Sequence, residues 1–135
     1  MLKVVIDTNV FISSLLFGGK PREIVELARS KIILNATSLF ILDEVKGVLI
    51  AKFLWEPRVA ETATTGIAGF SEMVSPKEQV DVVLDCKADN RIIECALESS
   101  ARFIVSGDRH LTDLKEYRGI RVVDPGTFLR MIAEK

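Results

Sequence analysis

The chain has 135 residues, of which 48% are hydrophobic and 27% charged, and its 18 basic and 19 acidic residues give a net charge of −1. This length suits one compact α/β domain over residues 1–135 and excludes two ordinary domains. The apolar content excludes a disordered chain, and the near-zero charge excludes the global basic field typical of many nucleic-acid-binding proteins.

The N-terminal apolar segment is interrupted by Lys3, Asp7 and Asn9, so we expect neither a membrane span nor a secretory signal. The two cysteines, Cys86 and Cys95, lack a second cysteine pair and a nearby histidine. A zinc site or disulfide framework is therefore not indicated, and we expect reduced, packed thiols. The sequence predicts a cytoplasmic protein.

Short β-branched runs alternate with helical patterns along the chain. The runs predict strands at residues 2–6, 32–34, 82–84, 103–105 and 120–123. Apolar periodicity predicts helices at residues 21–30, 38–53, 58–70, 90–100 and 125–135. This alternation is typical of a three-layer α/β/α sandwich with a mostly parallel central sheet. Such sheets bind ligands beyond the carboxyl ends of their strands.

Acidic residues follow two of the predicted strands. Asp7 comes directly after the first strand, and Asp108 follows residues 103–105 after Ser106 and Gly107. If the two strands are neighbours, a separation of ~4.8 Å brings both carboxylates within reach of one metal ion. Asp89 precedes the helix predicted at residue 90, where it either lies at the same edge or only caps that helix.

One glutamate lies on an apolar helix face. Glu44 has Ile41 three residues before it and Val48 four residues after it, so its carboxylate is predicted to turn inward. Asp43 and Glu94 have charged or small neighbours instead and are predicted to be solvated. An inward carboxylate needs a cation, a proton or a cleft, which singles out Glu44.

Four carboxylates gathered at one edge repel one another, by about 4 kcal/mol for each pair ~4 Å apart at an effective dielectric near 20. No lysine or arginine stands at an obvious inward position, which leaves protons or a hard divalent cation. Oxygen-only ligation suits Mg²⁺ or Mn²⁺. An acidic pocket loaded with such an ion attracts a phosphodiester and lowers the pKa of water.

Five segments together resemble one family: VVIDTNVFISSLL (4–16), SLFILDEVKGVL (38–49), DCKADNRIIECAL (85–97), FIVSGDRHL (103–111) and GIRVVDPGTFL (119–129). In order and spacing the chain resembles the PIN-domain ribonucleases, particularly the small single-domain toxin components of toxin–antitoxin pairs, which are VapC-like. The resemblance implies a PIN-like fold and a Mg²⁺- or Mn²⁺-dependent endonuclease that cuts RNA. It also implies a homodimer and a protein antitoxin as partner.

The resemblance further assigns residues. The family's catalytic, metal-binding acids are matched by Asp7, Glu44, Asp89 and Asp108. Asn9 and Ser106 match positions that hold the carboxylates or water by hydrogen bonds.

Other interpretations of single residues stay open. Asp7 and Asn9 also suit a helix cap, Asp108 suits a turn, and Asp85 suits a solvated loop. His110 is interpreted as an ordinary surface or capping residue.

Three other functions are alternatives. A phosphorylation-controlled receiver module needs paired acids after its first strand, and an aspartate phosphatase needs an acid where Asn9 stands. A catalytically silent RNA-binding protein of the same fold is the third.

Overall fold

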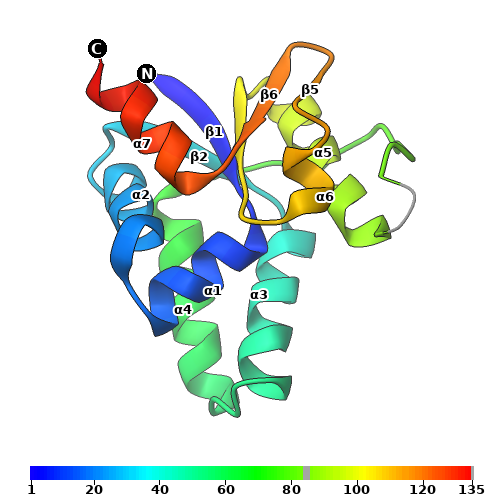
Figure 1. Ribbon diagram of the computed structural model, residues 1–135. Helices are drawn as coiled ribbons and strands as arrows, with labels where there is room; N and C mark the ends of the chain where they lie inside the picture. Colours follow the sequence, from blue (N-terminus) through cyan, green and yellow to red (C-terminus); the bar gives the residue numbers. More distant parts are fainter. Residues whose placement is uncertain (84–85, 135) are drawn as a thin grey trace.

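The computed structural model describes residues 1–83 and 86–134 (Figure 1). Within them, one sheet has the strand order β3-β2-β1-β4-β6-β5. Its strands are β1 (Leu2–Ile6), β2 (Ile33–Thr37), β3 (Ser71–Met73), β4 (Phe103–Val105), β5 (Glu116–Tyr117) and β6 (Ile120–Val123). All neighbouring strands pair in parallel except β5 and β6, which are antiparallel. The sheet is therefore mostly parallel, as predicted.

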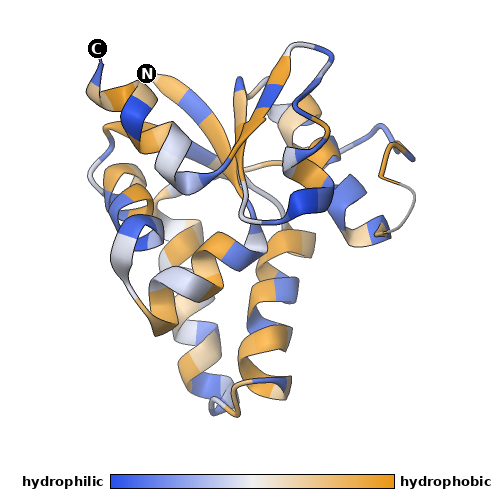
Figure 2. Cartoon of the chain, in the orientation of Figure 1, coloured by the Kyte–Doolittle hydropathy of each residue, from blue (hydrophilic) through white to orange (hydrophobic). Residues whose placement is uncertain are grey.

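Helices cover both faces of the sheet. They are α1 (Thr8–Leu16), α2 (Gly19–Arg29), α3 (Leu39–Ala51), α4 (Pro57–Gly69), α5 (Lys87–Ser99), α6 (Arg109–Thr112) and α7 (Pro125–Ala133). On β1, Val4 and Ile6 pack into a core with α1, α2, α3, α4 and α7, whereas Val5 packs into a second core with α5 and α6. Apolar residues accordingly dominate the central strands β1, β4 and β6 and alternate with polar ones along the helices (Figure 2). The predicted three-layer α/β/α architecture is confirmed.

The predicted helices match five observed ones within a few residues. The Ser38 hydroxyl caps α3 as expected, accepting a hydrogen bond from the Ile41 amide at 3.4 Å. The largest shift is at α5, which begins at Lys87, three residues before the predicted start. Trp55 and Tyr117 pack against the two cores. Both cysteines are free, and Cys95 is buried.

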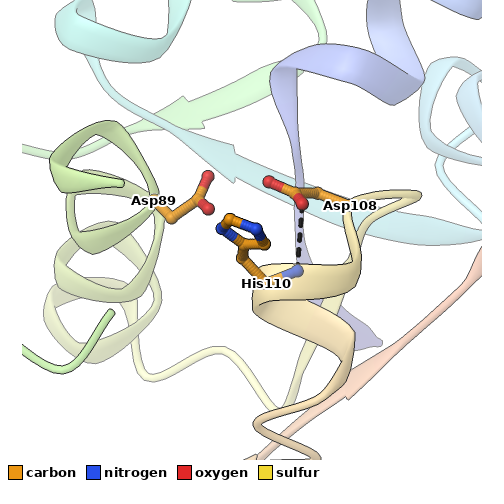
Figure 3. Close-up of side chains that lie close together, drawn as sticks. All are labelled: Asp89, Asp108 and His110. Atoms are coloured by element: carbon orange, nitrogen blue, oxygen red, sulfur yellow. Dashed lines mark hydrogen bonds between the residues drawn. The ribbon is translucent and has the colours of Figure 1, made fainter. Parts of the chain in front are cut away.

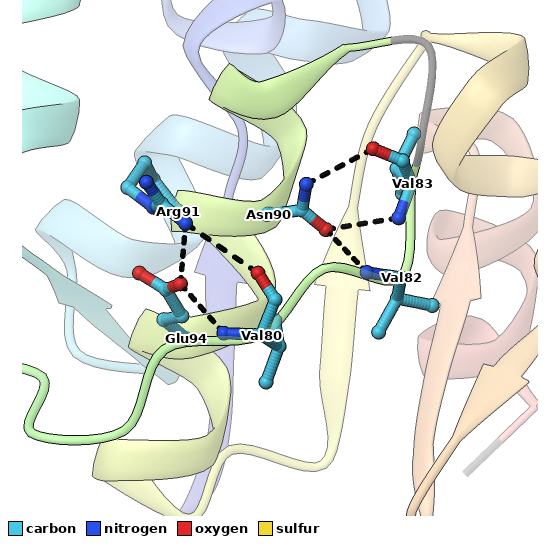
Figure 4. Close-up of polar contacts among 6 residues, drawn as sticks. All are labelled: Val80, Val82, Val83, Asn90, Arg91 and Glu94. Atoms are coloured by element: carbon cyan, nitrogen blue, oxygen red, sulfur yellow. Dashed lines mark hydrogen bonds and ion pairs between the residues drawn. The ribbon is translucent and has the colours of Figure 1, made fainter.

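The strand predicted at residues 82–84 is wrong for Val82 and Val83, and Leu84 lies outside the described residues. The Asn90 side chain accepts hydrogen bonds from the amides of Val82 and Val83 and donates one to the Val83 carbonyl, at 2.8–2.9 Å (Figure 4). These backbone groups are thus satisfied by a side chain and not by a strand. The edge strand β3 forms instead, where the sequence SEM has no apolar pattern to predict it.

None of the helices that the structure describes combines the length and apolar character needed to cross a bilayer.

Candidate active site

Four acidic residues line one pocket of about 380 Å³ at the carboxyl ends of β1 and β4. Asp7 follows β1, Glu44 lies on α3, Asp89 lies in the first turn of α5, and Asp108 immediately precedes α6. Because β1 and β4 pair in parallel up to Ile6 and Val105, the acids after these strands meet at the same edge. The structure therefore brings together the four acids that the sequence singled out.

Asp7 is the most enclosed of these acids, with 4% of its surface exposed. Its Oδ1 accepts a hydrogen bond from the Thr8 amide at 2.7 Å, so it caps α1. Its Oδ2 accepts hydrogen bonds from Ser106 Oγ at 2.7 Å and Asn9 Nδ2 at 3.1 Å. The capping interpretation of Asp7 is thus correct, and the same carboxylate lines the pocket.

The pKa of Asp7 is raised from 3.8 to about 6. Burial is the main cause, and the negative charges of Glu44 and Asp108 add to it. The hydrogen bonds from Ser106 and the Thr8 amide stabilise the ionised form and lower the pKa in part. A carboxylate in this position is costly to ionise unless a positive charge lies nearby.

Ser106 and Asn9 connect the segment after β4 to the start of α1. Ser106 is fully buried; while its hydroxyl donates to Asp7, it accepts a hydrogen bond from the Asp108 amide at 2.9 Å. Asn9 Oδ1 accepts a hydrogen bond from the Gly107 amide at 3.1 Å. These contacts fix the relative positions of Asp7 and Asp108.

Asp89 is 6% exposed, and its Oδ2 has no hydrogen-bond partner. It lies inside the first turn of α5, whose N-cap is Cys86, so the interpretation that it only caps the helix is wrong. The pKa of Asp89 is raised to about 7, mainly by burial and also by the neighbouring carboxylates of Asp108 and Asp7. An unpartnered buried carboxylate is an open ligand for a cation.

Glu44 is half-buried and turns toward the start of α1, where its Oε1 accepts a hydrogen bond from the Thr8 hydroxyl at 2.5 Å. Among residues 1–83 and 86–134 it forms no ion pair. Within the described part of the chain, the Glu44 carboxylate therefore has no basic side chain as a partner.

His110 and Lys52 also reach the site. From the sequence, His110 was interpreted as a surface or capping residue, and Lys52 was not identified. The amide of His110 donates a hydrogen bond to Asp108 Oδ1 at 3.0 Å, and its ring lies close to Asp89 and Asp108 (Figure 3). Lys52 lines the mouth of the pocket from the end of α3. The proximity of His110 to Asp108 in sequence was the available signal; Lys52 had none.

Three further acids, Glu94, Asp43 and Asp85, were predicted to be solvated. For Glu94 this is wrong: it is 5% exposed, and its Oε2 accepts hydrogen bonds from Arg91 Nη2 at 2.6 Å and the Val80 amide at 2.9 Å (Figure 4). The loop before α5 folds over this helix face and covers it. Asp43 is exposed as predicted, and Asp85 lies outside the described residues.

The residues present fit a divalent cation. Asp89 Oδ2 lacks a partner, burial and neighbouring carboxylates oppose the ionisation of Asp7 and Asp89, and the donors are hard oxygen atoms. A bound cation would offset the repulsion within this group.

The domain thus has a mostly parallel sheet with helices on both faces. Its acidic pocket lies at the carboxyl edge of that sheet. The chain matches the family model of the PIN domain over residues 3–110. It is 35% identical over 120 residues to the uncharacterised protein MJ1680 of Methanocaldococcus jannaschii, covering 85% of this chain and 76% of that protein. The chain belongs to the PIN domain family.

Solved structures share this fold at low sequence identity. VapBC2 from Rickettsia felis, bound to a promoter DNA fragment, matches with a TM-score of 0.65 and 14% identity over 91% of this chain and 98% of that one. DNA-bound VapBC from Salmonella typhimurium matches with a TM-score of 0.64 and 19% identity, over 93% of this chain and 99% of that one. PAE2754 from Pyrobaculum aerophilum matches with a TM-score of 0.64 and 13% identity, over 99% of this chain and 91% of that one.

Proposed function

We propose that the chain, as a single PIN-like domain over residues 1–135, is a Mg²⁺- or Mn²⁺-dependent endoribonuclease. The observation that supports this most directly is the convergence of Asp7, Glu44, Asp89 and Asp108 on one pocket. PIN domains are generally nucleases that use divalent metal ions, and this family membership gives the acids a common purpose.

In this proposal Asp7, Asp89 and Asp108 hold the cation, and Glu44 either joins them or positions the attacking water. A bound divalent cation supplies charge stabilisation to a phosphodiester and lowers the pKa of water. Ser106 and Asn9 keep the Asp7 carboxylate oriented, and the Thr8 hydroxyl holds Glu44. These supporting hydrogen bonds reduce the reorganisation that the site needs when substrate binds.

The rim of the pocket suits a single-stranded nucleic acid. Phe17, at the end of α1, is 78% exposed and lines the same pocket as the acids. Lys52 lies at the rim with its ammonium 5.9 Å from the ring centroid of Phe53. Exposed aromatic rings stack on bases of any sequence, and a lysine contacts the phosphate backbone. This combination supports a single-stranded nucleic acid as the substrate, and the choice of RNA rests on the resemblance to PIN-domain ribonucleases.

We also propose a protein antitoxin as partner, a homodimer as the working state and the cytoplasm as its location. The fold neighbours from R. felis and S. typhimurium are VapBC assemblies, which supports a role as the toxin component of such a pair. Expression in a bacterial host tests this role: the chain should inhibit growth, and a cognate antitoxin should relieve the inhibition and co-purify with the chain.

The nuclease proposal is tested by cleavage of a labelled RNA panel with Mg²⁺, with Mn²⁺ and after chelation. We expect wild-type cleavage to require the ion and Asp7→Asn or Asp108→Asn to lose at least a hundredfold in rate. Asp43→Asn is the matched control, because Asp43 is an exposed acid on α3 next to Glu44. Cleavage that survives chelation and both pocket substitutions would refute the proposal.

A further inference from the structure

We propose that His110 is a nitrogen ligand of the cation in the acidic pocket and makes the site select Mn²⁺ over Mg²⁺. This inference rests on the proposed function only in that a divalent cation binds among the four acids. It goes beyond that function because it assigns a role to a histidine and predicts which ion the site prefers.

The position of His110 is fixed by the short helix α6. Asp108 caps this helix by accepting the amide hydrogen of His110, and the next residue, Leu111, is fully buried in the core that α5 shares. The helix is therefore anchored at its start and on its inner side. As a result, the imidazole of His110 stands beside Asp108, opposite Asp89 on α5 (Figure 3).

The three side chains are close enough to share an ion. One ring nitrogen of His110, one oxygen of Asp89 and one oxygen of Asp108 all lie within 4.8 Å of one another. Two ligands of one ion lie at most about 4.2 Å apart when each bond is about 2.1 Å long. Ligands at right angles are about 3.0 Å apart, so side-chain rotations that move the ligand atoms by roughly 1 Å bring all three within reach of one ion.

The contacts within this group leave ligand positions free. Asp89 is more than nine-tenths buried and points its carboxylate toward the other two side chains, and its Oδ2 has no partner. Within the described residues, the His110 ring forms no ion pair or hydrogen bond, although two carboxylates lie nearby. An exposed histidine with no site role would be free to turn toward solvent, whereas this ring faces the two acids.

The chemistry of the ligands then sets the preference among ions. Mg²⁺ is a hard ion that favours oxygen ligands and gives up its water reluctantly. First-row transition ions accept imidazole nitrogen more readily, so one imidazole added to a carboxylate set strengthens Mn²⁺ binding more than Mg²⁺ binding. Removal of His110 should therefore reduce the difference between the affinities of the site for Mn²⁺ and for Mg²⁺.

The test is titration of metal-free protein with MnCl₂ and with MgCl₂, followed by the rise in melting temperature and by the EPR signal of free Mn²⁺. Pulsed EPR on the Mn²⁺-loaded protein then reports nitrogen bound to the ion. For wild type we expect Mn²⁺ to bind at least ten times more tightly than Mg²⁺, with a resolved imidazole nitrogen coupling. His110→Ala should lose about tenfold in Mn²⁺ affinity and the nitrogen coupling, with Mg²⁺ affinity nearly unchanged.

Arg109→Ala is the matched control, because Arg109 is an exposed residue of the same short helix. It should behave as wild type in every titration. Mn²⁺ that binds wild type without nitrogen coupling, or equal affinities for the two ions, would overturn the role of His110 and leave the nuclease proposal standing. Failure of both ions to bind would overturn both proposals.

Discussion

Ser106 Oγ donates a hydrogen bond of 2.7 Å to Asp7 Oδ2 across 99 positions of the sequence. The same hydroxyl accepts the amide hydrogen of Asp108 at 2.9 Å. One buried hydroxyl thus joins two of the four acids, because the parallel pairing of β1 and β4 ends both strands at the same level. Ser106 therefore couples the relative positions of Asp7 and Asp108 in the pocket to the pairing of β1 with β4.

Ser106→Ala should therefore weaken the site without unfolding the protein. Loss of the hydroxyl removes a hydrogen bond that lowers the pKa of Asp7, and it leaves the Asp108 amide without its acceptor. We expect Mn²⁺ affinity to fall roughly 10- to 100-fold, as is typical when a group that orients a ligand is removed. Calorimetric titration measures this, with the exposed Ser75→Ala as control; unchanged affinity would contradict it.

The stability of the metal-free protein should fall as pH rises. Asp7 and Asp89 have pKa values raised from 3.8 to about 6 and about 7 in the folded state. The folded protein holds these protons more tightly than the unfolded chain, so the stability they contribute is complete below pH ~4 and is lost as pH passes through their folded pKa values. We expect the free energy of unfolding to be roughly 1–3 kcal/mol larger at pH 5 than at pH 8.

Urea unfolding at the two pH values, in the presence of a chelator, measures this difference. Asp89→Asn should reduce it, and saturating Mn²⁺ at about 100 times its dissociation constant should add ~2.7 kcal/mol at pH 8. Stability that is constant or rises between pH 5 and pH 8 would show that the two carboxyls are not held protonated.

Asn90→Ala should destabilise the fold strongly. Asn90 is 1% exposed, and its side chain makes three hydrogen bonds to the backbone of Val82 and Val83. Removing it leaves these groups unpaired, so we expect a loss of about 2–4 kcal/mol in urea unfolding. Gln79→Ala, in the exposed part of the same loop, should change stability by less than about 0.5 kcal/mol; similar losses for both would contradict the anchoring role of Asn90.

Lys52→Ala should weaken RNA binding more than it slows the chemical step. Lys52 lies at the pocket rim, not among the acids, so we expect KM to rise several-fold with little change in kcat. The slope of the logarithm of the binding constant against that of salt concentration should decrease by about 0.7, as one phosphate contact is lost. Lys115→Ala, an exposed lysine outside the pocket lining, is the control; an unchanged salt slope would remove Lys52 from the interface.

The sequence predicts the parts of the site that follow from regular structure. Asp7 and Asp108 follow short apolar runs, so parallel pairing was sufficient to place them together. Glu44 stood out because its helical neighbours are apolar. The strand at β3 and the true start of α5 escaped prediction, since the first depends on pairing with β2 and the second has no capping side chain to mark it.

Long-range packing explains why the predictions for Glu94 and His110 differ from the structure. Glu94 has charged neighbours along its helix, yet the loop around Val80 folds over it and buries it. His110 stands two residues after Asp108 in sequence, but its proximity to Asp89 arises only because α6 docks beside α5. Neither relationship leaves a local pattern in the chain.

Anomalous diffraction from crystals soaked in Mn²⁺ tests most directly whether the acidic pocket binds a divalent cation. We predict an anomalous peak inside the pocket, in contact with carboxylate oxygens of Asp7, Asp89 and Asp108, that disappears in Asp7→Asn crystals. A peak elsewhere on the protein, or none inside the pocket at saturating Mn²⁺, would contradict it.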